Sequence, residues 1–391
     1  MYSWIFSLFG QTLPPVLIDK NRNCWLHCLL FSIYSIYSIV LGIFALYTSH
    51  VHHQIISHNS FIFDLDVITK ILSYAQNILL VGVQIFMEIK TIFAGNQLRD
   101  LLELLAELEY DLIVQCAQCP NSFNKYALKW KLLKISDISF VVLLTFLLYL
   151  GKFLTAEAMD TSFRIGILFF MAAMQMKCIE YSVYVQVVFE FLQAVYGNLV
   201  SIIQNLEHQP ANFDLIKQLL KNQMILNRVL SFVSRMGEYF AWHLLAVFFY
   251  NGEAVLNIFN SAYVIHLQQN QDEYVHFRIL YIVIMLTSIF IVSALTQRCI
   301  RKYNSIGALI HNVNVSTDEC DLFMRLREYS MQMMHQNLIF TCNGYMDIDF
   351  KCFGKMLLLI SSYVIILVQF KMEEANKGSL IAPQHIFGKN I

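Results

Sequence analysis

The sequence has few charged residues for its length. Lys, Arg, Asp and Glu make up 14% of its 391 residues, whereas 57% of the residues are hydrophobic and the mean hydropathy is +0.53. Soluble domains carry about 25% charged residues, so this composition excludes an ordinary soluble protein. The formal net charge of −1 argues against a nucleic-acid partner. The composition predicts a multipass protein of the lipid bilayer.

Proline is also scarce. The five prolines are Pro14, Pro15, Pro120, Pro210 and Pro383. None of them falls inside a long apolar segment, so no expected membrane helix has a proline kink.

Motifs for catalysis and metal binding are missing. The sequence has no P-loop, no glycine-rich nucleotide loop and no Ser/His/Asp arrangement, so we expect neither an enzyme nor a cofactor. The histidines between His50 and His58 have no fixed helical spacing and are interpreted as solvated loop residues. Cys116 and Cys119 have the spacing of metal ligands, but no second pair accompanies them. No metal site is predicted.

What the sequence does contain is a series of long apolar runs, which predict an all-α fold of seven membrane-spanning helices. The expected spans are Cys24–Thr48, Val67–Phe93, Ile135–Glu157, Phe163–Val188, Glu238–Ile265, Phe277–Gln297 and Lys351–Phe370.

Lysine and arginine are unevenly divided among the connections. The connections after the second, fourth and sixth expected helices each carry four or five of them, whereas residues 49–66 and 266–276 carry none. By the positive-inside rule this bias places the N-terminus inside the cell and the C-terminus outside. Lys371, Lys377 and Lys389 of the C-terminal tail mildly oppose that orientation.

The connections on the predicted cytosolic side are long and amphipathic. Helices are expected at Asn96–Val114, Phe213–Met236 and Asp318–Phe340, each with leucine-rich stripes on one face. Such stripes are usually packing faces. They indicate a helical cytosolic bundle that extends the membrane helices.

The last apolar stretch, Cys352–Phe370, has its polar residues on one stripe. Ser362, Ile366 and Gln369 fall at i, i+4 and i+7 of the expected helix. A glutamine in hydrocarbon needs partners or water. Two interpretations are open: a hydrogen bond that joins two membrane helices, or one wall of a water-filled pore.

Ser362-Tyr363, five apolar residues and Gln369-Phe370 resemble the ending of the insect gustatory receptor family, in which Thr-Tyr usually precedes five hydrophobic residues and Gln-Phe. Serine in place of threonine keeps the hydroxyl group. The resemblance implies a ligand-gated cation channel, built as a homo- or hetero-tetramer in which each subunit contributes its seventh helix to a central pore. It makes Ser362, Ile366 and Gln369 the expected pore-lining residues.

Hydropathy, the charge bias and the resemblance together divide the chain. Residues 1–23 become a cytosolic N-terminus and residues 24–297 the first six helices, with cytosolic helical loops at 94–134 and 189–237. Residues 298–350 become a cytosolic anchor loop where subunits meet, 351–370 the pore helix and 371–391 an extracellular tail.

The fifth expected helix carries His243, Tyr250, Glu253, Asn257 and Asn260 along one side. A carboxylate in this position must be hydrated, paired or neutral. We interpret the stripe as part of a pocket for a small organic molecule, with helix-to-helix hydrogen bonding as the alternative. The full set of expected pocket residues is Tyr74, Asn77, Tyr149, Tyr250, Glu253, Asn257 and Tyr281.

Two other classes of protein remain as alternatives. A G-protein-coupled receptor typically has Asp/Glu-Arg-Tyr after its third helix and Asn-Pro-x-x-Tyr in its seventh, and this sequence has neither. A multipass transporter is disfavoured by the missing inverted repeat. Sugar-sensing members of the resembled family carry an acidic residue after the final tyrosine, whereas Val364 follows Tyr363 here. We therefore expect a bitter or other non-sugar tastant, and a plasma-membrane location in sensory neurons.

Overall fold

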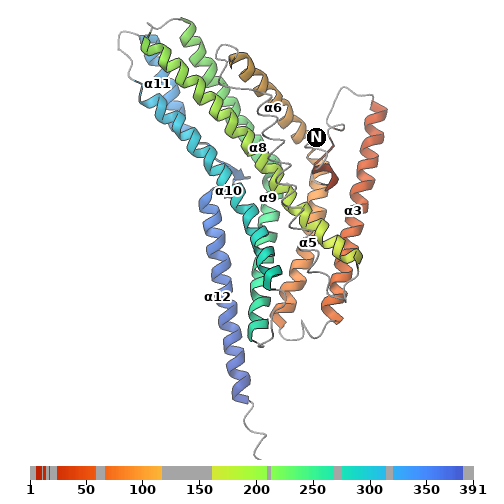
Figure 1. Ribbon diagram of the computed structural model, residues 1–391. Helices are drawn as coiled ribbons and strands as arrows, with labels where there is room; N and C mark the ends of the chain where they lie inside the picture. The colour runs from red at the N-terminus through yellow and green to blue at the C-terminus, as the bar shows by residue number, and fades with distance from the viewer. Residues whose placement is uncertain are drawn as a thin grey trace, which may run out of the picture.

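The computed structural model describes residues 6–10, 12–14, 17, 24–58, 67–116, 161–208, 213–267, 275–313 and 320–381. These residues form an elongated bundle of long helices (Figure 1). In chain order the helices are α3 (Cys24–His58), α5 (Val67–Phe93), α6 (Gly95–Cys116), α8 (Thr161–His208), α9 (Phe213–Leu267), α10 (Val275–His311), α11 (Cys320–His335) and α12 (Phe350–Ile381). Strands β1 (Thr341–Cys342) and β2 (Met346–Asp347) form an antiparallel hairpin between α11 and α12. The expected all-α fold is confirmed.

Three helices run through both halves of the bundle. α8, α9 and α10 contain 48, 55 and 37 residues. At ~1.5 Å per residue each is longer than the ~30 Å of hydrocarbon that a spanning helix must cross. In Figure 1 they continue upward to meet α6 and α11, while α3, α5 and α12 lie beside their lower parts. The long helices therefore connect the membrane half rigidly to the half that the charge bias places in the cytosol.

The expected helices Phe213–Met236 and Glu238–Ile265 are one uninterrupted helix, so separating them was wrong. Gly237, at the expected break, stays helical because both flanking segments pack in the core. A β-carbon at Gly237 would lie 3.2 Å from the Thr341 carbonyl oxygen of β1. The missing side chain thus lets the hairpin backbone approach α9 closely.

The membrane half contains six of the seven expected spans. α5 begins and ends at the expected residues, and the third span, Ile135–Glu157, lies outside the described residues. Within the described part of the chain, α3, α5, α8, α10 and α12 are long and apolar enough to cross a membrane. α9 is long enough but less apolar than these five helices, because the polar residues between His243 and Asn260 lower its hydropathy.

The other half of the bundle is held by amides and tyrosines. Tyr329 of α11 donates to the Asn222 side chain of α9 at 2.9 Å, and Asn222 donates to the Val195 carbonyl oxygen of α8 at 3.0 Å. Arg228 of α9 pairs with Asp111 of α6. The amphipathic stripes of α6, α9 and α11 are packing faces, as expected. The third of these helices was expected to continue to Phe340, and this was wrong: α11 ends at His335, and residues 336–340 are not helical.

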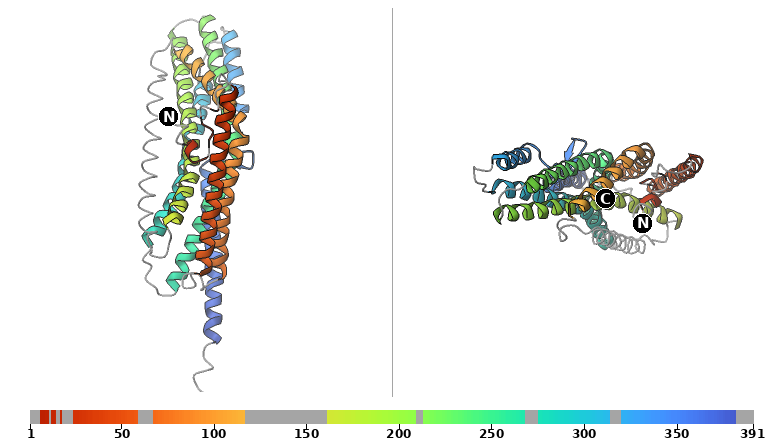
Figure 2. Two further views of the ribbon diagram at one scale, coloured as in Figure 1. Left: turned by 90° about the vertical axis from the view of Figure 1, so that its right-hand side faces the viewer. Right: turned by 90° about the horizontal axis from the view of Figure 1, so that it is seen from above.

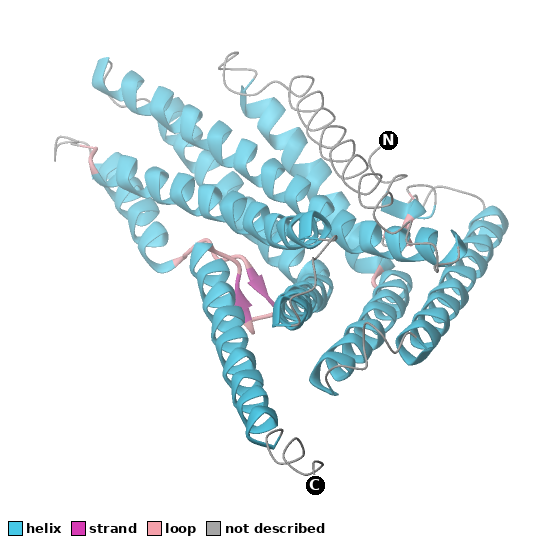
Figure 3. Cartoon of the chain, turned by 60° about the horizontal axis from the view of Figure 1, so that its bottom comes forward, coloured by secondary structure: helices cyan, strands magenta, loops and turns pink. Residues whose placement is uncertain are grey.

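A tight turn at Asn343 and Gly344 forms the hairpin. Both residues have positive φ angles, 51° and 77°, and Asn-Gly is the pair that most readily adopts this conformation. The buried Cys342 of β1 pairs in register with Met346, and burial raises the pKa of its thiol to about 12. That thiol is therefore protonated and unreactive near neutral pH. The hairpin lies just before the start of α12 (Figure 3), where the Asp349 side chain accepts a hydrogen bond from the Cys352 backbone N–H at 2.8 Å and caps the helix.

α12 extends beyond the rest of the bundle (Figure 2). Most of its side chains between Leu358 and Phe370 are exposed, although the segment is strongly apolar. The expected end of this helix at Phe370 was wrong. It continues to Ile381, and Lys371 is buried rather than part of a free tail.

Most of the described residues before α3 are packed inside the protein, although Leu8 is exposed. Phe6, Phe9, Leu13 and Leu17 belong to the main hydrophobic core. Leu13 fits against Gly95, where an added β-carbon would lie only 2.7 Å from the leucine Cδ1. The segment therefore forms part of the bundle.

Candidate functional site: polar clusters in the membrane half

Three of the expected pocket residues meet between α5, α9 and α10. Asn257 donates to the Gln76 side-chain oxygen at 2.5 Å, and Gln76 donates to the Tyr281 hydroxyl at 3.3 Å. The Tyr281 and Tyr250 hydroxyls are 3.2 Å apart. We call Gln76, Tyr250, Asn257 and Tyr281 the Tyr250 cluster. Its chain of amides and phenols combines hydrogen-bonding groups with aromatic surface, which suits a small organic ligand.

Gln76 was missed by the sequence analysis. It lies between Tyr74 and Asn77, and an amide inside an apolar helix was the available signal. A neighbouring network was missed as well: Gln175 of α8 donates to Asn251 at 3.2 Å, and Asn251 donates to Ser288 of α10 at 3.2 Å. Asn251 does not belong to the expected polar stripe of α9, which runs from His243 to Asn260.

The other expected pocket residues lie elsewhere. Asn77 turns toward α3 and donates to the Ser49 carbonyl oxygen at 3.1 Å. The Tyr74 ring lies 5.0 Å from the His53 ring. Both line a depression of about 460 Å³ between α3 and α5. Tyr149 lies outside the described residues.

Glu253 lies one turn from Tyr250 and one turn from Asn257 on α9, but it lines a space that the Tyr250 cluster does not line. It lines a cavity of about 930 Å³ between α9, the hairpin and α12. Both of its carboxylate oxygens are buried, and neither accepts a hydrogen bond from the residues that the structure describes.

The residues of the final motif are exposed on α12. Ser362, Tyr363, Ile366, Gln369 and Phe370 all present much of their surface outside the bundle. The Ser362 hydroxyl donates to the Leu358 carbonyl oxygen of the same helix at 2.8 Å. The polar stripe is therefore not buried against another helix of the described chain.

The far end of α12 is tied to two other helices. Lys371 donates to the Thr69 hydroxyl of α5 at 3.4 Å, and Asn260 of α9 donates to the same oxygen at 2.9 Å. We call Thr69, Asn260 and Lys371 the Lys371 latch. Because Asn257 lies one turn from Asn260, the latch and the Tyr250 cluster share one helix.

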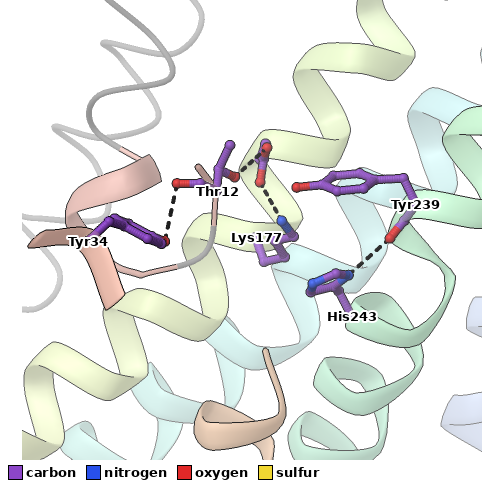
Figure 4. Close-up of polar contacts among 6 residues, drawn as sticks. Thr12, Tyr34, Lys177, Tyr239 and His243 are labelled. Carbon is purple, nitrogen blue, oxygen red and sulfur yellow. Dashed lines mark hydrogen bonds and ion pairs between the residues drawn. The ribbon is translucent and has the colours of Figure 1, made fainter. Parts of the chain in front are cut away.

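A buried ion pair lies deeper in the bundle, where α8 meets the N-terminal segment (Figure 4). Lys177 and Glu180, which are one turn apart on α8, lie 2.8 Å from each other with side chains 0% and 1% exposed. Thr12 donates to the second carboxylate oxygen of Glu180 at 2.7 Å, and Tyr34 of α3 donates to the Thr12 carbonyl oxygen at 3.4 Å. The Lys177 ammonium also lies 5.0 Å from the Tyr239 ring centre. This pair connects α8 with the N-terminal segment, α3 and α9.

Comparison with known proteins identifies the family. The profile of the 7tm chemosensory receptor family matches residues 1–374, which is almost the whole chain. The chain belongs to this family. The receptor is 27% identical to gustatory receptor 98b of Drosophila melanogaster, covering 95% of this chain and 94% of that protein. It is 24% identical to gustatory receptor 98c of the same species, over 95% and 93% of the two chains.

Solved structures of an insect olfactory receptor share the fold. The receptor superposes on olfactory receptor OR5 from Machilis hrabei with a TM-score of 0.64 at 13% identity, covering 94% of this chain and 97% of that one. The same protein in complex with eugenol gives a TM-score of 0.63 at 14% identity. The seven-helix fold and the gustatory receptor resemblance are thus confirmed, and the receptor is not an enzyme.

Proposed function

We propose that the receptor is one subunit of a ligand-gated, non-selective cation channel for small-molecule taste cues, with α12 lining the pore. The observation that carries this proposal is the exposure of Ser362, Ile366 and Gln369 along α12. A single helix with two polar residues cannot enclose a conduit. Four copies around one axis would turn the same residues into rings, with hydrophobic and polar constrictions.

The assembly would bury surface that one subunit leaves exposed. Apolar residues of α11 such as Met331 and Met334 are 47% and 71% exposed. By the charge bias this half is cytosolic, where such surface is unfavourable unless a partner covers it. We therefore propose that the anchor, residues 298–350, contacts neighbouring subunits of a homo- or hetero-tetramer. The α12 helices would then lie at the centre of that tetramer, in the plasma membrane.

The Tyr250 cluster is the proposed ligand site. Its phenols and amides can bind a neutral, partly aromatic molecule by stacking and hydrogen bonds. Val364 after Tyr363 supports a bitter or other non-sugar ligand rather than a sugar. The similarity to gustatory receptors supports a location in sensory neurons.

Electrical recording tests the channel proposal. Cells that express the receptor, alone or with other gustatory receptor subunits, are exposed to a panel of bitter compounds and sugars. A cation current that persists with G proteins blocked supports the channel. A ligand response that requires G-protein turnover, with no current in excised patches, would contradict it.

Removing an amide from the Tyr250 cluster is expected to weaken the response to agonist. Asn257→Ala deletes the donor to Gln76, and a hydrogen bond of this type contributes about 0.5–1.5 kcal/mol. The concentration for half-maximal current should therefore rise by roughly 2- to 13-fold, with surface expression unchanged.

Ser261→Ala is the matched control for this variant. Its hydroxyl lies one turn further along α9 and donates to the Asn257 backbone carbonyl, so the dose response should not move. If Asn257→Ala instead lowers surface expression while the surviving channels keep their sensitivity, the cluster only joins helices.

Breaking the Lys371 latch is expected to change gating. Lys371→Met and Thr69→Val each remove the contact between α12 and α5. Both should shift the agonist dose response in the same direction. Because Thr69→Val also removes the acceptor for Asn260, the double variant should shift it no further than Thr69→Val alone. Independent, additive shifts would show that the two residues are not coupled.

A further inference from the structure

The cavity beside Glu253 is separate from the proposed ligand site. Tyr250 and Asn257 direct their hydrogen bonds toward α5 and α10. The cavity opens from the same helix toward α12 and the hairpin, and has a volume of about 930 Å³. That volume falls in the range of about 300–1,000 Å³ for sites that bind drug-sized molecules.

The walls of the cavity are mostly apolar. Phe248, Phe249 and Leu256 of α9 face Met356, Leu359 and Ile360 of α12 across it. The two helices come close beside Gly252, where an added β-carbon would lie 3.2 Å from the Met356 methyl carbon. Methionine is a flexible side chain that can adjust to a guest. These walls suit the hydrocarbon body of a ligand.

Glu253 is the only charged residue that α9 contributes to this cavity, whereas Asp347, Asp349, Lys351 and Lys355 line it from the hairpin and the first turns of α12. Other carboxylates in the membrane half have donors, since Gln84 donates to Glu88 at 2.8 Å and Lys177 and Thr12 donate to Glu180. For Glu253, no donor is found among the residues described, and both oxygens are buried. A buried carboxylate without donors is strongly unfavourable. A guest that supplies N–H donors would relieve that cost.

We infer that the α9–α12 cavity binds a small amphipathic organic cation, a protonated amine with an aliphatic or aromatic body. Because both Glu253 oxygens are buried, this side chain turns toward the cavity when the guest binds, and the ammonium group then donates to it. The body packs between the phenylalanines of α9 and the leucine and isoleucine of α12. The phenol of Tyr363, from the final motif, also lines the cavity and can face the cation. Because the guest contacts the proposed pore helix, its binding should modulate the current.

The test compares 4-phenylbutylamine with 4-phenylbutan-1-ol, which has nearly the same shape but no charge. Binding is measured directly on the purified, assembled receptor in phosphatidylcholine nanodiscs, so the result does not depend on channel activity. The amine should bind about ten-fold or more tightly than the alcohol, as a charge-assisted hydrogen bond predicts. In Glu253→Gln this ratio should fall close to one.

Two controls make the result specific. Glu328→Gln removes an equally charged group from the exposed surface of α11, and should leave the ratio at its wild-type value. Leu359→Trp fills the cavity and should weaken both probes while the receptor remains assembled. If Glu253→Gln keeps the wild-type ratio, or the wild type shows no saturable binding of the amine, the inference is wrong.

A lipid could supply the same ammonium chemistry. Nanodiscs that contain phosphatidylethanolamine distinguish this source from a soluble amine. Unchanged affinity for 4-phenylbutylamine supports the small-molecule site, whereas loss of binding as this lipid is added overturns it in favour of a lipid headgroup. Failure of the channel proposal would leave the binding result unaffected, and would remove only the effect on current.

Discussion

Lys177→Met is expected to remove the receptor from the cell surface. The substitution leaves Glu180 as a buried charge that has lost its cation, since both side chains are at most 1% exposed. Breaking one side of a buried pair costs about 3–5 kcal/mol, a large share of the ~5–15 kcal/mol that stabilises a typical domain. Surface biotinylation and the unfolding temperature of the purified receptor measure the loss.

Arg325→Met is the matched control. Arg325 and Glu328 have the same i,i+3 spacing and nearly the same separation, 2.9 Å, but their side chains are 48% and 50% exposed. Solvated pairs contribute about 0–1 kcal/mol, so this variant should express normally. If Lys177→Met is equally harmless, the buried pair does not organise the core.

Removing both charges should restore part of the stability. In Lys177→Met/Glu180→Leu no uncompensated charge is left, and apolar replacements of buried pairs are often neutral. Thr12 would lose its acceptor, so the rescue should be incomplete. A double variant less stable than Lys177→Met would contradict this explanation.

Ile366→Ala is expected to raise the current in the absence of agonist several-fold. If α12 lines the pore, Ile366 forms its apolar constriction one turn from Gln369, and an apolar ring can close a pore by excluding water. Shortening the side chain widens and wets the ring. Gln369→Ala should alter the permeability ratios of cations without the same leak, because it changes the polar ring.

Ile365 provides the control for position. It is 57% exposed, compared with 44% for Ile366, but projects about 100° around the helix. Ile365→Ala should therefore leave both leak and selectivity unchanged. Equal leak in the two alanine variants would mean that exposure alone, and not the stripe of Ser362, Ile366 and Gln369, determines the effect. Unchanged currents in all the variants would remove α12 from the pore.

Hydropathy and charge were sufficient to predict the membrane class and most helices. A helix that crosses hydrocarbon must satisfy its backbone internally and present apolar side chains, so its signal is local. α5 accordingly agrees with its expected bounds at both ends. The expected ends of α3, α8, α10 and α12 were wrong, as was the division of α9, because how far a helix continues depends on what its residues pack against. The histidines from His50 to His58 accordingly belong to α3 and not to a loop.

Part of the candidate site could also be predicted. The stripe on α9 identified Tyr250 and Asn257, and Tyr281 was chosen from α10. Spacing on one helix fixes the face that a side chain occupies, but not which neighbouring helix lies opposite. The sequence therefore did not predict that Gln76 of α5 contacts Tyr281 of α10. It also grouped Glu253 with Tyr250 and Asn257, although Glu253 lines a cavity beside α12.

The sequence by itself determined the lipid environment, the helical class and the family, because each depends on composition or on residues within a few turns. Only the tertiary structure decided that Thr12 completes the buried pair of Lys177 and Glu180 across 168 positions and that Lys371 reaches Thr69 across 302. It also decided that Glu253 faces α12 through a cavity. Contacts between distant segments depend on how whole helices pack, and a helix carries no local signal of which neighbour its polar face will meet.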